Sequence, residues 1–293
     1  MLETDQNQFF ESAIFQAIGE EAEVKFIHFI TGGCINNTIQ LNTNRGEFFL
    51  KWNEESSLEM YEKEVKGLEV LRANSSITIP QVLGLGKVEN KAFLLLEFID
   101  EGFQSPTYWT DFGRKLAEMH KSTTSDKFGL DFNNFIGSLQ QNNEFHVDWI
   151  EFFVEKRLRS QFGLAYYNKL IDVSYLRKLD QLPQALERIF PKEKPSLLHG
   201  DLWSGNAMRD QQGNPCLVDP AVYYGHREME LAFTKLFGGF DNSFYQAYEE
   251  AFPLEIGFKD RKDIYNLYPL MVHVNLFGTS YLSGIDKVLE RIL

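Results

Sequence analysis

Cysteine is scarce in this chain, and long apolar runs are absent from it. Two cysteines, Cys34 and Cys216, are too few for a disulfide framework, which favours a reducing compartment, so we expect a cytoplasmic protein. No segment reaches the roughly eighteen continuous apolar residues of a membrane-spanning helix. The first residues also lack the basic and apolar regions of a secretory signal. We therefore expect no membrane partner.

Basic residues are also too few for some classes of partner. The chain has 29 Lys and Arg against 42 Asp and Glu, a net charge of −13. Nucleic-acid binding needs a basic surface, and so does electrostatic attachment to anionic lipids, so both are disfavoured. With 293 residues, the chain can form two lobes that each bury an apolar core. We expect it to be a monomer or a weak dimer.

The first hundred residues predict a small β-rich lobe. After an amphipathic helix at Phe9–Ile18, alternating apolar residues and turn signals predict five antiparallel strands, with a periodic helix at Ser56–Arg72 between the third and fourth. The predicted strands are Val24–Thr31, Thr38–Leu41, Glu47–Trp52, Gln81–Val88 and Lys91–Ile99.

Helical periodicity dominates the rest of the chain, and the only strand-like pieces flank Asp201. The fold class is therefore predicted to be α+β and two-lobed. Residues 1–99 form a nucleotide-binding lobe, residues 100–293 form a helical lobe, and a ligand cleft lies at their junction. The expected helices are Thr107–His120, Val147–Phe162, Val173–Phe190, Glu228–Phe237, Ser243–Ala251 and Lys259–Phe277.

One constellation in the second lobe points to chemistry. Asp201 follows His199-Gly200, Asn206 comes five positions later, and Asp219 comes thirteen positions after that, at the end of an apolar strand. Phosphoryl transfer needs a carboxylate that accepts the proton of the attacking hydroxyl, and hard oxygen ligands that hold Mg²⁺ against a nucleotide. Asp201 suits the base, and Asn206 with Asp219 suits the metal.

Two other interpretations of this constellation have less support. His-Gly-Asp alone is common in structural turns, because Gly and Asp favour turn conformations, but Asn206 and Asp219 at these spacings favour the catalytic interpretation. A phosphoesterase with two metals would need several His and carboxylate ligands together. The six histidines of this chain are isolated from one another in the sequence.

A lysine in the third predicted strand supplies a possible phosphate ligand. Lys51 stands in an otherwise apolar run, and Glu64 follows in the inserted helix. Such a strand lysine and helix glutamate form the ion pair that holds nucleotide phosphates in kinase-type sites. The alternative is a lysine that extends to solvent at a sheet edge. Glu62 is a competing partner, but packing of the neighbouring apolar residues on the sheet favours Glu64.

The remaining nucleotide contacts are expected from the backbone. Gly32 and Gly33 lie between the first two strands, where glycines let backbone N–H groups approach phosphates, although they also suit a plain hairpin turn. The next residue, Cys34, is either an oxidation-sensitive thiol or a small semi-buried side chain. The Glu97 carbonyl and the Ile99 N–H are the candidates for binding the adenine edge.

These motifs resemble the fructosamine kinase (ketosamine-3-kinase) family, in the aminoglycoside-phosphotransferase branch of the protein-kinase-like fold. The resemblance extends end to end. Trp-Ser-Gly-Asn and Tyr-Gly-His-x-Glu-x-Glu-Leu-Ala are specific to this family, whereas His-Gly-Asp is shared by the whole branch. The matching segments are Leu197–Asn206, Asp219–Ala232, Phe237–Phe240 and Gly32–Ile35.

The resemblance implies ATP-dependent, Mg²⁺-dependent phosphorylation of the 3-hydroxyl of a ketosamine, free or attached to a protein, which leads to loss of the sugar. It assigns the base to Asp201, the metal to Asn206 and Asp219, and phosphate binding to Lys51 with Glu64. Trp203 would contact the sugar, Glu230 would brace the catalytic loop, and His226 or Glu228 would face the substrate.

Two alternatives stay open at this stage. An aminoglycoside- or choline-type kinase of the same fold would use the same residues. A non-catalytic nucleotide-binding scaffold would not need them all. Asp219-Pro220-Ala221 replaces the Asp-Phe-Gly of protein kinases and no activation-loop segment follows, so a small acceptor is favoured over a protein hydroxyl.

Overall fold

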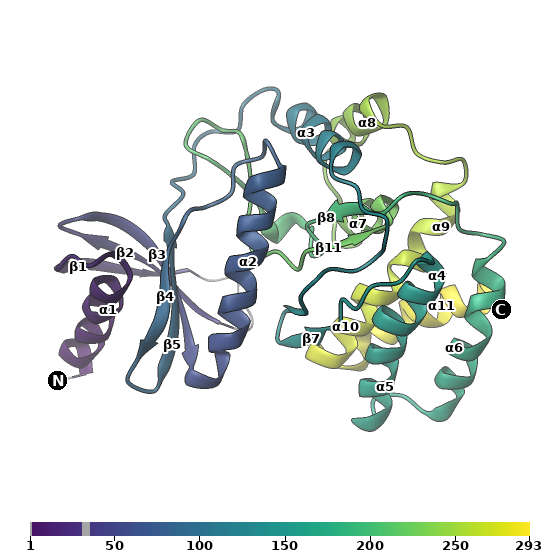
Figure 1. Ribbon diagram of the computed structural model, residues 1–293, viewed down its shortest axis with the longest axis horizontal. Coiled ribbons are helices and arrows are strands. Elements are labelled where there is room, and N and C mark those ends of the chain that lie inside the picture. Colours follow the sequence, from purple (N-terminus) through teal and green to yellow (C-terminus); the bar gives the residue numbers. More distant parts are fainter. Residues whose placement is uncertain (1, 31–35) are drawn as a thin grey trace. The chain divides into compact units, whose positions relative to one another are not determined.

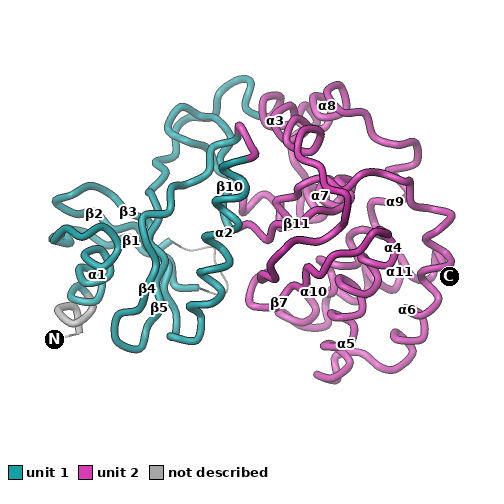
Figure 2. The backbone as a smooth tube through the Cα atoms, in the orientation of Figure 1, with its two compact units in different colours: residues 1–73, 77–108, 207–219 teal, residues 74–76, 109–206, 220–293 magenta. Residues whose placement is uncertain are grey.

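The computed structural model describes residues 2–30 and 36–293 (Figure 1). The chain forms two compact units (Figure 2). Unit 1 contains Met1–Ala73, Ile77–Tyr108 and Ala207–Asp219, and unit 2 contains Asn74–Ser76, Trp109–Asn206 and Pro220–Leu293. No helix among the described residues is both long and apolar enough to cross a membrane.

Unit 1 is built on a five-stranded antiparallel sheet with the order β1-β2-β3-β5-β4. The predicted sheet and its inserted helix are confirmed. The elements of this unit are α1 (Leu2–Ile18), β1 (Val24–Phe29), β2 (Asn37–Thr43), β3 (Gly46–Glu54), the 3₁₀ turn η1 (Glu55–Ser57), α2 (Leu58–Asn74), β4 (Val82–Val88), β5 (Lys91–Glu97), β9 (Ala207–Arg209) and β10 (Pro215–Leu217).

Each face of the sheet is covered by one helix (Figure 1). Because side chains alternate along a strand, Leu50 and Trp52 of β3 point to one face, where they join Phe10 of α1 in the apolar core. Lys51 points to the other face, toward α2. Helix α1 lies so close to β4 that a Cβ atom on Gly84 would come within 2.5 Å of the Ala17 Cβ.

A hairpin distant in sequence completes unit 1. Strands β9 and β10 pair with each other, and Cys216 of β10 forms a bridge with Thr78. The Thr78 hydroxyl donates to Asp210 at 2.9 Å, and the Tyr108 hydroxyl donates to the Met208 carbonyl at 3.0 Å. Residues 207–219, which end at Asp219, therefore fold with the N-terminal sheet.

Unit 2 is mainly helical. Its elements are α3 (Tyr108–Ser122), β6 (Asn134–Ile136), β7 (Leu139–Gln141), α4 (Trp149–Phe152), the π-helical segment η2 (Phe153–Arg159), α5 (Ser160–Tyr167), α6 (Val173–Leu186), β8 (Ser196–Leu198), the 3₁₀ turn η3 (Ser204–Asn206), β11 (Tyr223–Gly225), α7 (Arg227–Thr234), α8 (Asn242–Ala251), α9 (Phe258–Tyr265), α10 (Leu267–Phe277), the 3₁₀ turn η4 (Thr279–Tyr281) and α11 (Leu282–Ile292).

Unit 2 departs from the sequence prediction in several places, among them two helix ends: α6 ends at Leu186 rather than Phe190, and α7 ends at Thr234 rather than Phe237. The expected helix at Val147–Phe162 continues to Tyr167 and contains the π-helical segment η2. The expected helix at Lys259–Phe277 divides into α9 and α10 at Asn266. Pro269 lies in the first turn of α10, where its missing N–H costs no helical hydrogen bond. The hairpin β6–β7 and helix α11 were not predicted.

The contact between α1 and β4 gives a stability prediction. We expect Gly84→Ala to lower the free energy of unfolding by about 1–3 kcal/mol, because the new methyl group overlaps Ala17. Chemical denaturation with circular dichroism measures this change.

Gly163→Ala is the matched control, because no atom of the described residues lies within 4 Å of the new Cβ in α5. It should leave stability unchanged or raise it by up to about 1 kcal/mol, since alanine is the better helix former. Equal effects of the two substitutions would contradict the close approach of α1 to the sheet.

Candidate active site

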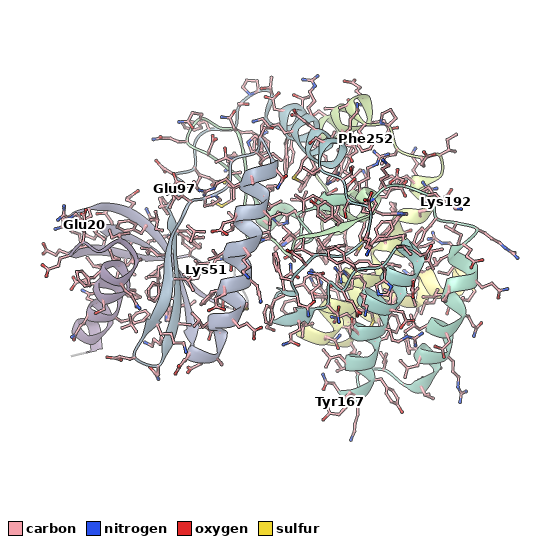
Figure 3. All side chains as sticks on the ribbon, in the orientation of Figure 1. Glu20, Lys51, Glu97, Tyr167, Lys192 and Phe252 are labelled. Atoms are coloured by element: carbon pink, nitrogen blue, oxygen red, sulfur yellow. The ribbon has the colours of Figure 1, made fainter. Side chains whose placement is uncertain are left out.

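The strand lysine of unit 1 lies between two carboxylates. Lys51 is only 3% exposed, and it projects from β3 toward α2 (Figure 3). Its Nζ donates to Glu64 Oε1 at 2.8 Å and also to Asp219 Oδ1. The predicted Lys51–Glu64 ion pair is confirmed, and Glu64 rather than Glu62 is the partner.

These carboxylates decide the charge state of the lysine. Burial alone would lower the pKa of Lys51, but the charges and hydrogen bonds of Asp219 and Glu64 together raise it above its ordinary value. The ammonium therefore stays protonated, so unit 1 holds a fixed positive charge with a carboxylate on each side.

Asp219 has an unusual backbone conformation at the end of the hairpin. Its φ angle is +55°, in the left-handed region that few non-glycine residues adopt, although Asp tolerates it better than most. Its side chain is 47% exposed while it contacts Lys51. Strained backbone of this kind often marks functional sites, because the surrounding structure has to hold it in place.

In unit 2, strand β8 leads into a loop that carries Asp201. The buried Glu230 of α7 accepts the His199 N–H and the Gly200 N–H, both at 3.1 Å, so the predicted bracing of this loop by Glu230 is confirmed. Gly200 has a φ of +85°, and a Cβ there would lie 2.0 Å from the Ala221 carbonyl oxygen. Only glycine fits this position.

Asn206 closes the same loop. Its Nδ2 donates to the Asp201 carbonyl at 2.8 Å and to Asp201 Oδ2 at 3.0 Å. The nitrogen end of the carboxamide is thereby engaged with Asp201, and the oxygen is the end that can serve as a metal ligand. The structure thus brings Asp201 and Asn206 together within unit 2, and Lys51, Glu64 and Asp219 together within unit 1.

The sequence did not predict the buried hydrogen bonds that His120 makes to Glu230 and Tyr248. His120 of α3 lies 3.2 Å from Glu230 through Nε2, and 2.8 Å from the Tyr248 hydroxyl through Nδ1. Burial alone would raise the pKa of Glu230, but the hydrogen bond and attraction of His120, with His199 and the Gly200 N–H, hold it below its ordinary value. A single histidine in an amphipathic helix gave no signal of this role.

Trp203, a predicted sugar contact, is half-buried in the same loop. Its indole and the Phe237 ring form a T-shaped pair with 6.4 Å between centroids, and a Cβ on Gly205 would lie 2.4 Å from the indole. The glycine of Trp-Ser-Gly-Asn therefore leaves room for the tryptophan. The Trp203 residue as a whole is partly exposed.

His226 and Glu228, the other predicted substrate residues, belong to the core. Both carboxylate oxygens of Glu228 accept hydrogen bonds from Arg261, at 2.6 and 2.8 Å. His226 stacks on Trp149 with 4.5 Å between ring centroids, and burial, Arg261 and Arg227 hold its pKa well below the ordinary value. Their side chains are fully buried, so the expectation that they face a substrate is corrected.

The predicted backbone contacts lie partly outside the described residues. Gly32, Gly33 and Cys34 belong to residues 31–35, which the structure does not describe. Glu97 ends β5, where its N–H donates to the Gln81 carbonyl at 2.8 Å and its exposed side chain accepts the Gln81 N–H at 3.1 Å (Figure 3). Ile99 follows it and is partly exposed.

Comparison with known proteins identifies the family. The model of the family described as "Fructosamine kinase" matches residues 7–293. The chain belongs to the fructosamine kinase family. It is 42% identical over 267 residues to a probable ketoamine kinase of Enterococcus faecium, covering 89% of this chain and 93% of that protein. It is 38% identical over 279 residues to a chloroplastic protein-ribulosamine 3-kinase of Arabidopsis thaliana, covering 94% and 85%.

Solved structures agree with this assignment. A putative fructosamine-3-kinase from Haemophilus somnus superimposes with a TM-score of 0.88 at 31% identity, covering 98% of each chain. Aminoglycoside phosphotransferase APH(4)-Ia superimposes with a TM-score of 0.61 at 16% identity, covering 97% of this chain and 98% of that one. The second likeness concerns the fold alone. The predicted α+β, protein-kinase-like fold is confirmed, and this kinase family is one of phosphotransferases.

The bracing of the loop that carries Asp201 by Glu230 predicts a pH effect on stability. The pKa of Glu230 in the folded protein lies below its ordinary value of 4.5, so its stabilising contribution is complete above about pH 4.5 and is lost as the pH falls through the lower, folded value. We expect the difference in free energy of unfolding between wild type and Glu230→Gln to be constant near neutral pH and to shrink in acid.

Urea unfolding between pH 3 and pH 7 measures this difference. Glu250→Gln is the control, because Glu250 lies on the exposed part of α8. Its difference from wild type should change much less over the same range. A Glu230→Gln difference that grows toward acid pH would contradict the stabilised carboxylate.

Proposed function

We propose that this protein transfers the γ-phosphate of ATP to the 3-hydroxyl of a ketosamine, and that the product then sheds its sugar. Membership of the fructosamine kinase family supports the reaction class, and the names of the relatives support ketosamines as acceptors. The observation that carries the proposal is the buried Lys51 ammonium, which is bound to Glu64 and to Asp219 at once.

In the proposed mechanism, Asp201 accepts the proton of the 3-hydroxyl while the hydroxyl oxygen attacks the γ-phosphorus. The bond from that phosphorus to the β–γ bridging oxygen breaks, and ADP leaves with the electron pair. Lys51, oriented by Glu64, binds α- and β-phosphate oxygens and offsets their charge. The hydrogen bond from Asn206 fixes the orientation of the Asp201 carboxylate. Trp203 offers an indole face to the C–H side of the sugar.

The donor set suits Mg²⁺. Asp219 offers a carboxylate and Asn206 offers a carboxamide oxygen, and Mg²⁺ prefers hard oxygen ligands completed by water and phosphate oxygens. The amide nitrogen of Asn206 is already engaged by Asp201, which leaves the oxygen end for a cation. When bound, the ion would neutralise charge on the phosphates. Gly32 and Gly33 would cover these phosphates, while the Glu97 carbonyl and the Ile99 N–H would bind the adenine edge.

We propose the same assignment of functions to the two parts of the chain as in the sequence prediction. Residues 1–99 would bind the nucleotide, and residues 100–293 would supply the catalytic loop and the acceptor site, with Asp219 carried by the hairpin that folds with unit 1. A ketosamine, free or attached to a protein, is the proposed partner. We keep the predictions of a cytoplasmic location, of a monomer or weak dimer, and of no membrane or nucleic-acid partner.

A panel of acceptors tests the substrate class. We expect turnover of ATP with ribulose- and fructose-lysine, and nuclear magnetic resonance should place the new phosphate on the 3-hydroxyl. Aminoglycosides and choline are the control acceptors and should give no turnover above background. Turnover with an aminoglycoside or choline alone would replace this proposal with the small-molecule kinase alternative. ATP binding without any turnover would indicate the scaffold.

A substitution of Asp201 tests the base. We expect Asp201→Asn to lower kcat by a factor of about 10² to 10⁴, because a positioned base contributes about that much. ATP affinity should change little. The contact of Asn206 with the backbone carbonyl of residue 201 does not involve the altered side chain. Steady-state kinetics and calorimetric nucleotide binding measure both effects.

Asp241→Asn is the matched control. Asp241 caps α8 by accepting the Ser243 N–H, and asparagine caps helices equally well. This control should keep wild-type kcat. Wild-type kcat in Asp201→Asn would remove Asp201 from the mechanism.

A further inference from the structure

Three buried carboxamides of unit 2 form a network that the mechanism above does not use. Asn134 belongs to β6, Gln141 to β7, and Asn143 follows two residues later. Their exposures are 4%, 1% and 0%. Gln141 Nε2 donates to Asn134 Oδ1 at 2.8 Å, and Asn143 Nδ2 donates to the same oxygen at 3.0 Å. Burying so many polar groups is tolerable only when their hydrogen bonds are made.

The network ends on two consecutive backbone carbonyls. Gln141 Nε2 donates to the Ala221 carbonyl at 3.0 Å, and Asn134 Nδ2 donates to the Val222 carbonyl at 2.8 Å. Both residues precede β11, so their carbonyls need partners outside that strand. The Ala221 N–H in turn donates to the His199 carbonyl at 2.8 Å. The Ala221 residue is therefore held through both its N–H and its carbonyl.

A buried cation supports the other end of the network. Arg157 is fully buried, and its guanidinium donates to Asn143 Oδ1 and to the Asn142 carbonyl, both at 2.7 Å. It lies over the ring of Tyr223 at 4.0 Å, which adds cation–π attraction. Its Nε has no hydrogen-bond partner within the part of the chain that the structure describes. Arg157 is in the π-helical segment η2, a type of irregularity that is frequent at functional sites.

The position of these contacts gives them a consequence for catalysis. Ala221 follows Pro220, whose ring fixes its own φ angle, and Pro220 follows Asp219. Because the φ angle of Pro220 is fixed, holding the Ala221 backbone in place also restricts the backbone of Asp219. Asp219 has the left-handed conformation. Through His199, the same peptide also contacts the loop that carries Asp201.

We propose that Gln141, held by Asn134, Asn143 and Arg157, is a positioning residue that fixes residues 219–222 and the His199–Gly200 backbone for phosphoryl transfer. This inference rests on the proposed function for its effect on turnover. Gln141 touches no reacting atom and acts through Ala221.

Gln141→Met tests this role, because methionine keeps the length of the side chain and removes its hydrogen bonds. We expect kcat to fall about 10- to 100-fold, the usual cost of a small misplacement of reacting groups, with KM for the ketosamine little changed. We also expect AMP-PNP, a non-hydrolysable ATP analogue, to need several-fold more Mg²⁺ for half-maximal binding in calorimetry. Amide hydrogen exchange at Ala221 should become faster.

Gln161→Met is the matched control. Gln161 is 2% exposed in α5 of the same unit, and its side chain accepts a hydrogen bond from Asn275 at 2.8 Å. It makes none of the contacts to residues 199–222 described above. Its kcat, Mg²⁺ requirement and Ala221 exchange should match wild type, even where its melting temperature falls as much as that of Gln141→Met.

Tyr268→Phe is a milder second variant, useful if Gln141→Met does not fold. It removes the 2.8 Å hydrogen bond to Gln141 Oε1 and leaves the bond to Ala221. We expect a smaller change in the same three measurements. Wild-type kcat, Mg²⁺ requirement and exchange in these variants, with only the melting temperature lowered, would overturn the positioning role. A wild-type protein that turns over no ketosamine would refute the proposed function instead, and the binding and exchange measurements would still decide the role of Gln141.

Discussion

The ammonium of Lys51 can stay charged inside unit 1 only because carboxylates flank it. Removing a cation from water costs several kcal/mol unless close partners and hydrogen bonds offset the loss. Glu64 from α2 and Asp219 from the returning hairpin supply those partners. Helix α2 and the hairpin at residues 207–219 therefore both form an ion pair with the same lysine of β3. A nucleotide phosphate would meet a cation whose side chain is already held in place, so little ordering would be needed on binding.

Unit 2 also contains a buried charge that depends on close partners, but there the charge is negative. Glu230 is a buried anion, and it is stabilised by two backbone N–H groups and by His120. These hydrogen bonds shape the loop before Asp201, because both N–H groups belong to consecutive residues of that loop. A buried charge thus fixes backbone geometry in each unit. Removing Lys51 would leave the Glu64 carboxylate buried without its ion-pair partner, which is the costly outcome.

Sequence reasoning succeeded where a residue type conflicted with its surroundings. Lys51 stands out in an apolar strand, and the neighbouring apolar residues of α2 set which glutamate could face it. It failed in α7, where all eight residues from Arg227 to Thr234 are buried. Periodicity marks an exposed face only when a helix has one, so the directions of His226 and Glu228 could not be inferred. His120 and Glu230 lie 110 positions apart, and no local pattern links them.

Short elements were missed for a related reason. Strands β6 and β7 have three residues each, which is too few for an alternating pattern. The hydrogen bonds of their carboxamides go to Ala221 and Val222, which are distant in sequence. The hairpin at residues 207–219 was expected within the second lobe, because nothing in its sequence indicates its bridge to Thr78. Tertiary contacts of this kind decide positions that local propensity leaves open.

The route of the chain after Asp219 also favours the proposed ketosamine acceptor over a protein hydroxyl. Ala221 and Val222 are pinned by buried carboxamides, β11 pairs at once with β8, and α7 begins at Arg227. Helix α7 then returns Glu230 to the amides of His199 and Gly200. Ala221 and Glu230 thus both contact the loop that carries Asp201. A protein hydroxyl as acceptor would need a separate extended segment at this point of the chain, whereas the backbone of Ala221, Val222 and β11 is already hydrogen-bonded within the unit.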